Sequence, residues 1–349
     1  MMRAVNLTLL VLLKHENSRR VFMVTFLMIL TACTPFIRAP GQSIYTPQLN
    51  EKEFFTSDGE ILAMQSWGPK VVAPKAIIIA LHGFNDYSNF FKIPGAFLAN
   101  QAILSYAYDQ RGFGKSKHPG AWSGTRTMVD DLKTFIHLIK QRHSGTPLYL
   151  LGESMGGALI MVAATESPKL DVDGVILSAP AVWGRLTMPW YQRLALWIGV
   201  RIMPSVAMTG EGLNIKPSDN IKMLLALNHD PFVIKKTRID AIYGLVNLMD
   251  TALDRAVSFS ESTLILYGEK DEIIPLKPTH LMLARLPQTE KKQYRLAFYK
   301  NGYHMLLRDL NAKTAWRDIV SWIKDNDLPF VSGADINAYE RLSGLINKK

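Results

Sequence analysis

The chain has 349 residues, of which 48% are hydrophobic and 20% are charged, so it can bury a large core and is not intrinsically disordered. Its formal net charge is +10, but the lysines and arginines are scattered, with only short pairs among them. No basic stripe with interleaved aromatic residues is present, so the charge does not indicate nucleic-acid binding, and a surface near anionic lipid is the simpler interpretation.

An apolar segment near the N-terminus predicts export. Two arginines precede an uncharged run from Val21 to Ala32, which is too short to cross a bilayer and suits the apolar part of a secretion signal. The run ends at Cys33, the only cysteine, and residues 30–33 resemble the lipobox of bacterial lipoproteins. We therefore expect a lipoprotein-type signal at residues 1–32 and an acylated Cys33 that anchors the chain in the bacterial cell envelope. The alternative is an ordinary signal or a short anchor helix followed by an idle thiol.

Strands and helices alternate from Glu51 onward. The predicted strands cover residues 51–56, 60–67, 75–81, 103–109, 148–151, 175–178, 263–267 and about 295–299. The predicted helices cover residues 128–140, a segment that begins at 155, and residues 315–324. Ser57-Asp58-Gly59 between the first two strands favours a hairpin. Strands separated by helices at this spacing predict an α/β fold with a mostly parallel central sheet and helices on both faces.

Three glycines surround a lone serine in the stretch LYLLGESMGGALIMVAA, residues 148–164. A G-x-S-x-G string is weak evidence alone, because it occurs by chance in roughly one chain in ten of this length. Here it follows a predicted strand and precedes a predicted helix, and a sharp turn between the two requires tiny residues two positions before and after the turning residue. Gly152 and Gly156 meet that requirement, so Ser154 is expected to present its hydroxyl at the edge of the sheet as a nucleophile.

A serine hydroxyl is a poor nucleophile unless a base accepts its proton and a third group orients that base. His304 follows the last predicted strand and Asp271 follows the strand before it, so both are expected at the carboxyl edge of the sheet. His280 lies nine residues after Asp271 with no strand between them, which makes it the weaker candidate for the base. Glu269 and Glu272 remain alternatives for the acid.

The segment Leu81-His82-Gly83-Phe84 also follows a predicted strand. Its loop can supply the backbone N–H of Phe84, which together with the N–H of Met155 would form an oxyanion hole. His82 precedes the serine in the chain and is expected to buttress this loop. The string RGFGKS at residues 111–116 lacks the glycines that a Walker A loop or a dinucleotide fingerprint requires, so we expect no nucleotide. We also expect no cofactor and no metal.

Six segments in this order resemble the monoacylglycerol lipase and lysophospholipase group of α/β-hydrolases, also described as serine-aminopeptidase-like hydrolases. They are LHGFNDYSNFF, YDQRGFGKS, GESMGGA, NHDPFV, YGEKDEIIP and NGYHMLLRD. The resemblance covers about Glu51 to Lys324. It implies Ser154 as nucleophile, His304 as base, Asp271 as orienting acid, and Phe84 and Met155 as oxyanion donors.

The resemblance further implies a serine hydrolase that cleaves carboxylic esters through an acyl-enzyme, with monoacylglycerol or lysophospholipid as the substrate. Fold does not settle function, and two other classes remain open. One is a peptidase or acyltransferase that uses the same triad. The other is a non-enzymatic surface lipoprotein built on this fold. No protein partner is indicated by the sequence.

The strand rhythm stops between Ser178 and about Ser258, which predicts a helical cap inserted over the sheet. An amphipathic helix is expected there, with one apolar face that includes Trp190 and Trp197. This face either packs on the core, or lines an acyl pocket or contacts a bilayer. The expected divisions of the exported chain are a linker at 33–50, the hydrolase core at 51–180 and 259–330, the cap at 181–258, and a weakly patterned tail at 331–349.

Overall fold

The computed structural model describes residues 35–210, 212, 214–287 and 294–346. The predicted signal segment at residues 1–32 and the predicted lipidation site Cys33 lie outside this part of the chain. Within it, no helix combines the length and the apolar character needed to cross a membrane.

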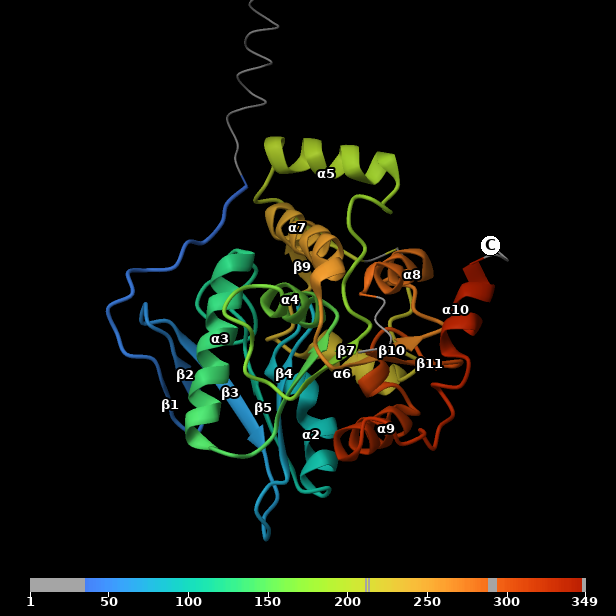
Figure 1. Ribbon diagram of the computed structural model, residues 1–349. Coiled ribbons are helices and arrows are strands. Elements are labelled where there is room, and N and C mark those ends of the chain that lie inside the picture. Colours follow the sequence, from blue (N-terminus) through green and yellow to red (C-terminus); the bar gives the residue numbers. More distant parts are fainter. Residues whose placement is uncertain (1–34, 211, 213, 288–293, 347–349) are drawn as a thin grey trace, which may run out of the picture.

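Most strands of the described chain form one central sheet (Figure 1). They are β1 (Gln48–Leu49), β2 (Glu53–Phe55), β3 (Ile61–Trp67), β4 (Ala76–Leu81), β5 (Ile103–Tyr108), β6 (Leu148–Glu153), β7 (Gly174–Ser178), β10 (Thr263–Gly268) and β11 (Tyr294–Tyr299). Their spatial order is β1-β2-β3-β5-β4-β6-β7-β10-β11. The hairpin of β2 and β3 is antiparallel, as its turn residues predict. The strands β5, β4, β6, β7, β10 and β11 pair in parallel in this spatial order.

Helices cover both faces of the sheet (Figure 1). The helices of the described chain are α2 (Lys92–Ala99), α3 (Thr125–Arg142), α4 (Met155–Ala164), α5 (Trp190–Ile202), α6 (Ile221–His229), α7 (Ile239–Arg255), α8 (Leu276–Arg285), α9 (Ala312–Lys324) and α10 (Ala338–Ile346). Short 3₁₀ helices lie at η1 (Ser88–Phe91), η2 (Ala256–Ser258) and η3 (Leu306–Arg308). The predicted α/β class with a mostly parallel sheet is confirmed.

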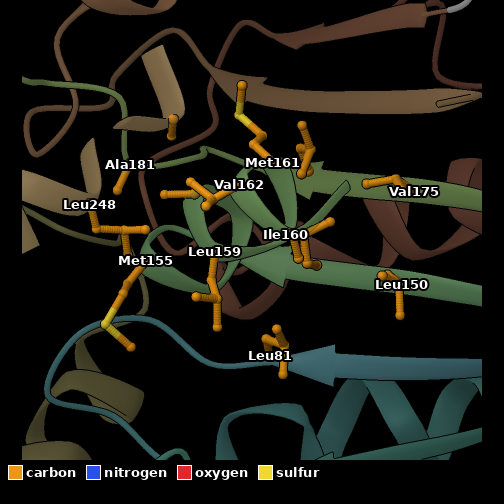
Figure 2. Close-up of a cluster of buried hydrophobic side chains, with 14 of the residues drawn as sticks. Leu81, Leu150, Met155, Leu159, Ile160, Met161, Val162, Val175, Ala181 and Leu248 are labelled. Atoms are coloured by element: carbon orange, nitrogen blue, oxygen red, sulfur yellow. The ribbon is translucent and has the colours of Figure 1, made fainter. Parts of the chain in front are cut away.

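The central strands read as continuous apolar runs because both of their faces are covered. In β4, Ile77, Ile79 and Leu81 belong to the core beneath α3, α4 and α7. The alternating residues, Ala76, Ile78 and Ala80, belong to the core beneath α2 and α9. Figure 2 shows the first of these cores around α4, with Leu81, Leu150 and Val175 on three adjacent strands and Leu159 and Ile160 on the helix. This buried helix fixes the turn that precedes it.

The interval between β7 and β10 holds α5, α6, α7 and a small antiparallel sheet of β8 (Ala207–Thr209) and β9 (Lys236–Arg238). Helix α7 packs against α4, and Val246, Leu248 and Leu253 are part of the main core. Helix α5 packs on α7 and has Val200 as its buried residue. The cap limits at 181 and 258 stay a prediction, but the second half of this interval is part of the core.

The apolar face predicted for residues 190–198 does not pack on the core. In α5, Trp190 is 72% exposed, Leu194 46%, Trp197 44% and Ile198 38%. Leu196, Gly199 and Val200 face the protein instead. The first alternative of the sequence interpretation, burial of this face, is therefore wrong.

The C-terminal segment is more ordered than its sequence pattern indicates. Residues 331–349 were expected to be a weakly patterned tail, yet α10 packs on β11 and α8. Phe330 and Ala334 are buried on one side of the sheet, and Ala338 and Leu342 are buried on the other. Arg295 of β11 binds Asp335 at 2.5 Å and further fixes this segment.

Candidate active site

The stretch around Ser154 forms a tight strand-to-helix turn between β6 and α4. Ser154 has φ 53° and ψ −113°, a left-handed region that residues with a side chain rarely adopt. A Cβ atom at Gly152 would collide with the backbone of Gly156 and Gly157, and one at Gly156 would collide with the carbonyl of Leu81. The two glycines that the sequence singles out are therefore required by close backbone contacts.

The backbone on both sides of the turn is hydrogen-bonded. The Ser154 N–H donates to the Ser178 carbonyl at 3.0 Å, and the Ala181 N–H donates to the Ser154 carbonyl at 2.9 Å. These bonds hold the serine at the ends of β6 and β7, where the N-terminus of α4 favours negative charge. The Met155 side chain is fully buried and lies beside Leu248 in Figure 2. It is part of the core, so it is not freely replaceable, although only its N–H is expected to act on substrate.

The structure brings Asp271 and His304 together. His304 Nδ1 lies 2.8 Å from Asp271 Oδ2, and both side chains are buried. The other oxygen, Oδ1, accepts hydrogen bonds from the N–H groups of Ile273 and Ile274, each at 2.9 Å. The backbone therefore orients the carboxylate, and the carboxylate orients the imidazole. Because Nδ1 is engaged, Nε2 is the ring nitrogen left to accept a proton from serine.

Burial opposes the charged imidazolium of His304 and by itself lowers its pKa. The charge of Asp271, the hydrogen bond to it, and the charge of Glu153 outweigh this effect, whereas the charge of Arg308 opposes them. The net result is a His304 pKa above its ordinary value. This is the direction expected of a base that must carry a proton in the transition state.

The rival residues lie elsewhere. His280, on α8, stacks on Tyr339 of α10 with ring centroids 5.7 Å apart. Glu272 is exposed and accepts a hydrogen bond from the Lys216 N–H at 2.7 Å. Asp271 is thus the carboxylate of this loop that binds the buried histidine.

The loop after β4 lies against the nucleophile. A Cβ atom at Gly83 would be 3.4 Å from the Ser154 Cβ, so the segment that holds Phe84 passes directly beside Ser154. His82 is fully buried, its Nε2 accepts the Gln110 N–H at 3.0 Å, and its Nδ1 lies 2.8 Å from the Gly83 carbonyl. A neutral ring with its proton on Nδ1 satisfies both contacts. Burial lowers the pKa of His82 and favours this neutral form. The contacts of His82 with Gly83 and Gln110 confirm the prediction that it buttresses the loop.

Three residues near the site were not predicted from the sequence. Arg308 lies 2.7 Å from Asp86 and 2.6 Å from Glu153, and all three are buried. Glu153 and Arg308 were inside quoted motifs, directly before the serine and four positions after the histidine. A charged residue inside an otherwise apolar strand end is the signal that could have identified Glu153.

The RGFGKS segment has a structural role. The Arg111 guanidinium binds Asp58 of the β2–β3 turn and Asp131 of α3, with two hydrogen bonds to each. It therefore joins the hairpin to the helix layer. Among the described residues, no group of three or more His, Cys, Asp or Glu side chains is placed to hold a metal ion.

Known proteins share this fold and sequence pattern. Human monoglyceride lipase is 24% identical over 82% of this chain and 93% of its own length. Monoacylglycerol lipase of Mycolicibacterium smegmatis is 23% identical over 78% of this chain and 96% of its own length. A soluble variant of Saccharomyces cerevisiae monoglyceride lipase, solved in complex with a substrate analog, superposes with a TM-score of 0.65 at 21% identity and covers 82% of this chain and 98% of that one.

The family model described as serine aminopeptidase, S33, matches residues 72–311, which include the nucleophile turn, the Asp271–His304 pair and the loop of Phe84. The match extends over more than half of the chain. This chain therefore belongs to the serine aminopeptidase S33 family of α/β-hydrolases.

Proposed function

We propose that this protein is a serine hydrolase that cleaves carboxylic esters of monoacylglycerols or lysophospholipids through an acyl-enzyme. The observation that carries the proposal is the buried Asp271–His304 pair, with 2.8 Å between Oδ2 and Nδ1, at the same sheet edge as the strained turn of Ser154. Relatives named as monoglyceride or monoacylglycerol lipases support the ester and substrate class.

The proposed reaction has two halves. Ser154 Oγ attacks the ester carbonyl carbon while His304 Nε2 takes the hydroxyl proton, and the oxyanion accepts hydrogen bonds from the Phe84 and Met155 N–H groups. The C–O bond to the alcohol then breaks, and His304 returns the proton to that alcohol. In the second half, His304 deprotonates a water that attacks the acyl-enzyme, and the carboxylic acid leaves as Ser154 regains its proton.

The exposed surface of the cap suits a lipid substrate. On α5 and the following segment, the exposed large apolar side chains are Trp190, Tyr191, Leu194, Trp197, Ile198, Ile202, Met203, Val206 and Met208. The Arg201 guanidinium stacks over the Trp197 ring, with 4.2 Å to the ring centroid. An exposed helix face that combines aromatic and basic residues is typical of a segment that lies in the interface of an anionic bilayer.

We infer that this face contacts the membrane on which an acylated Cys33 holds the protein. The described chain begins on the side of α7 (Figure 1), with the Arg38 N–H bound to the Trp122 carbonyl at 2.8 Å. Trp122 in turn lies against Gly244 of α7. A tether that arrives on this side would bring α5 toward the lipid. Localisation in a bacterial cell envelope remains part of this proposal.

The experiment is activity-based labelling followed by a substrate panel. Full-length protein in detergent is treated with a fluorophosphonate probe, which labels only an activated serine, and the labelled residue is identified by mass spectrometry. The panel compares a monoacylglycerol, a lysophospholipid, a short-chain ester, a peptide amide and an alcohol acceptor, with Ser154→Ala as the matched control. Labelling at Ser154 with preferred ester turnover supports the proposal.

The other outcomes contradict it in distinct ways. Preferred cleavage of the peptide amide indicates a peptidase, and transfer to the alcohol indicates an acyltransferase. An unlabelled, folded protein indicates a binding module. The anchor is tested by mass spectrometry of the mature N-terminus and by partitioning of Cys33→Ser into membranes. If this variant partitions as the wild type does, the wild type does not depend on an acyl group at Cys33.

A further inference from the structure

A single buried guanidinium connects three loops of the candidate active site. Arg308 Nη1 lies 2.7 Å from Asp86 Oδ2, and Nη2 lies 2.6 Å from Glu153 Oε1. The three side chains are each no more than 7% exposed. We call Asp86, Glu153 and Arg308 the buried ionic cluster.

Each member of the cluster belongs to a segment that carries a proposed catalytic group. Glu153 directly precedes the nucleophile Ser154, Asp86 lies two residues after Phe84, and Arg308 lies four residues after His304. The Glu153 Oε1 atom also approaches the oxyanion loop, since it is 3.8 Å from the position of a Cβ on Gly83. Arg308 is therefore the point at which the nucleophile turn, the oxyanion loop and the histidine loop are joined by side chains.

The cluster also acts on the base electrostatically. When all three groups are ionised, two carboxylates face one guanidinium, so a negative charge remains inside the protein. Burial raises the pKa of Glu153 and the Arg308 charge opposes that rise, while Asp86 adds to it. The charged groups that act on His304 are Asp271, Glu153 and Arg308. Of the two carboxylates, Glu153 is the one outside the proposed triad.

Glu153 depends on Arg308 for its counter-charge. Glu153 Oε2 is buried and has no hydrogen-bond partner among the described residues, so Arg308 is the cation that compensates this carboxylate. A guanidinium can bind two carboxylates through separate nitrogens in a fixed plane, whereas an ammonium is a single point charge. Removal of Arg308 would leave two buried carboxylates uncompensated.

We propose that Arg308 and Glu153 are positioning residues of the hydrolytic reaction. Arg308 fixes the three catalytic loops relative to one another, and Glu153 supplies a negative charge that stabilises the His304 imidazolium formed when Ser154 gives up its proton. The inference rests on the proposed triad and adds to it two residues that do not contact substrate.

The first test is the pH dependence of kcat/KM for a short-chain ester with Glu153→Gln, which keeps the shape of the side chain and removes its charge. The acid limb of this profile reports the pKa of the general base in the free enzyme, which is His304. Loss of the Glu153 charge lowers the His304 pKa, so the limb moves to lower pH by about one unit, and kcat at pH 8 falls roughly tenfold as the same amount of imidazolium stabilisation is lost.

The second test separates kcat from KM in Arg308 variants. Arg308→Met is expected to lower kcat about 100-fold with KM nearly unchanged, because small displacements of reacting groups have large effects on rate. Arg308→Lys keeps the charge but cannot bind both carboxylates in the same way, so it is expected to recover only part of that loss. Should Arg308→Met fail to fold, the Glu153→Gln profile decides.

The matched control is Arg295→Met, which removes a partly buried ion pair with Asp335, 2.5 Å long, on the outer strand β11. This variant tests whether loss of any partly buried ion pair changes the pH profile of kcat/KM. The acid limb of its profile is expected to coincide with that of the wild type. An unmoved acid limb in Glu153→Gln, or a wild-type kcat in Arg308→Lys, overturns the proposal. Fluorophosphonate labelling of the wild type at Ser154 is checked first, so a failure of the triad itself is recognised separately.

Discussion

Asp271 holds His304 in place from a position that the backbone has already fixed. Its Oδ2 contacts His304 Nδ1 at 2.8 Å while Oδ1 accepts two backbone N–H bonds in its own loop. The carboxylate is thus oriented before it meets the histidine. An asparagine at this position can keep an oxygen that accepts both N–H bonds, so Asp271→Asn should disturb the imidazole without disturbing the loop around it.

Asp271→Asn is therefore expected to lower kcat by roughly 10⁴-fold. An amide in place of the orienting carboxylate of a serine triad favours the wrong histidine tautomer, and the loss is of this size. Steady-state kinetics on a soluble ester measures it. The matched variant is Glu269→Gln in the same loop, for which near wild-type turnover is expected. The reverse pattern would assign the acid to Glu269.

Ser154→Ala removes the proposed nucleophile and is expected to lower kcat by about three to six powers of ten. The alanine must occupy the same left-handed backbone conformation, so folding is verified by circular dichroism. Wild-type ester turnover by the folded variant would exclude Ser154 as the nucleophile.

The raised pKa of His304 predicts where activity declines at low pH. The base functions only when neutral, so kcat/KM should fall as pH drops through the His304 pKa, and this midpoint should lie above the ordinary histidine value of about 6.5. In Asp271→Asn the charge that raises the pKa is gone, so the residual activity should extend to lower pH. A wild-type midpoint below about 6.5 would show that burial, not Asp271, dominates the His304 pKa.

The nucleophile turn and the positions of the central strands could be predicted because local chemistry requires them. No side chain fits at Gly152 or Gly156, and parallel strands covered on both faces must be apolar throughout. Each feature can therefore be recognised in a short segment of the sequence. The pairing of Asp271 with His304 follows from the same logic, since each follows its own strand. These features need no knowledge of distant contacts.

Other features depend on residues far apart in the chain and leave no local signal. Asp86, Glu153 and Arg308 are separated by 67 and 155 positions, and nothing in their neighbourhoods pairs them. The apolar face of α5 has the same periodicity whether it is buried or exposed, so its direction could not be read from the pattern. Helix α10 is short, and its packing on β11 and α8 stabilises it more than its own sequence does.

The exposure of α5 predicts a specific effect on membrane binding. In a Cys33→Ser background, which removes the expected acyl anchor, Trp190→Ser with Trp197→Ser should weaken sedimentation with anionic vesicles and lower turnover of vesicle-borne monoacylglycerol. The kcat/KM for a soluble ester should not change, because neither tryptophan is in the catalytic loops. Val71→Ser, at a 94% exposed position in the β3–β4 loop, is the control. Equal vesicle binding by all three proteins would argue against a membrane role for α5.

Arg111 gives a prediction for stability rather than chemistry. It is buried between Asp58 and Asp131, and burial of Asp131 raises the pKa of that carboxyl to about 6 even though Arg111 lowers it. Arg111→Met leaves both carboxylates without their cation, so the free energy of unfolding should fall by about 3–5 kcal/mol. Ester turnover under native conditions should be preserved, because Arg111 is not part of the catalytic loops.

The sign of the pH dependence distinguishes this explanation from simple loss of packing. Without Arg111, the pKa of Asp131 rises further, so the folded protein binds a proton that the unfolded chain releases above about pH 4. The free energy of unfolding then decreases as pH rises. The difference in this free energy between the wild type and Arg111→Met should therefore be greater at pH 8 than at pH 5. Urea unfolding at both pH values measures it, with the exposed Arg126–Asp130 pair as the control, since Arg126→Met should leave the unfolding midpoint unchanged. Equal losses at the two pH values would indicate that packing of the Arg111 side chain, not its charge, stabilises this region.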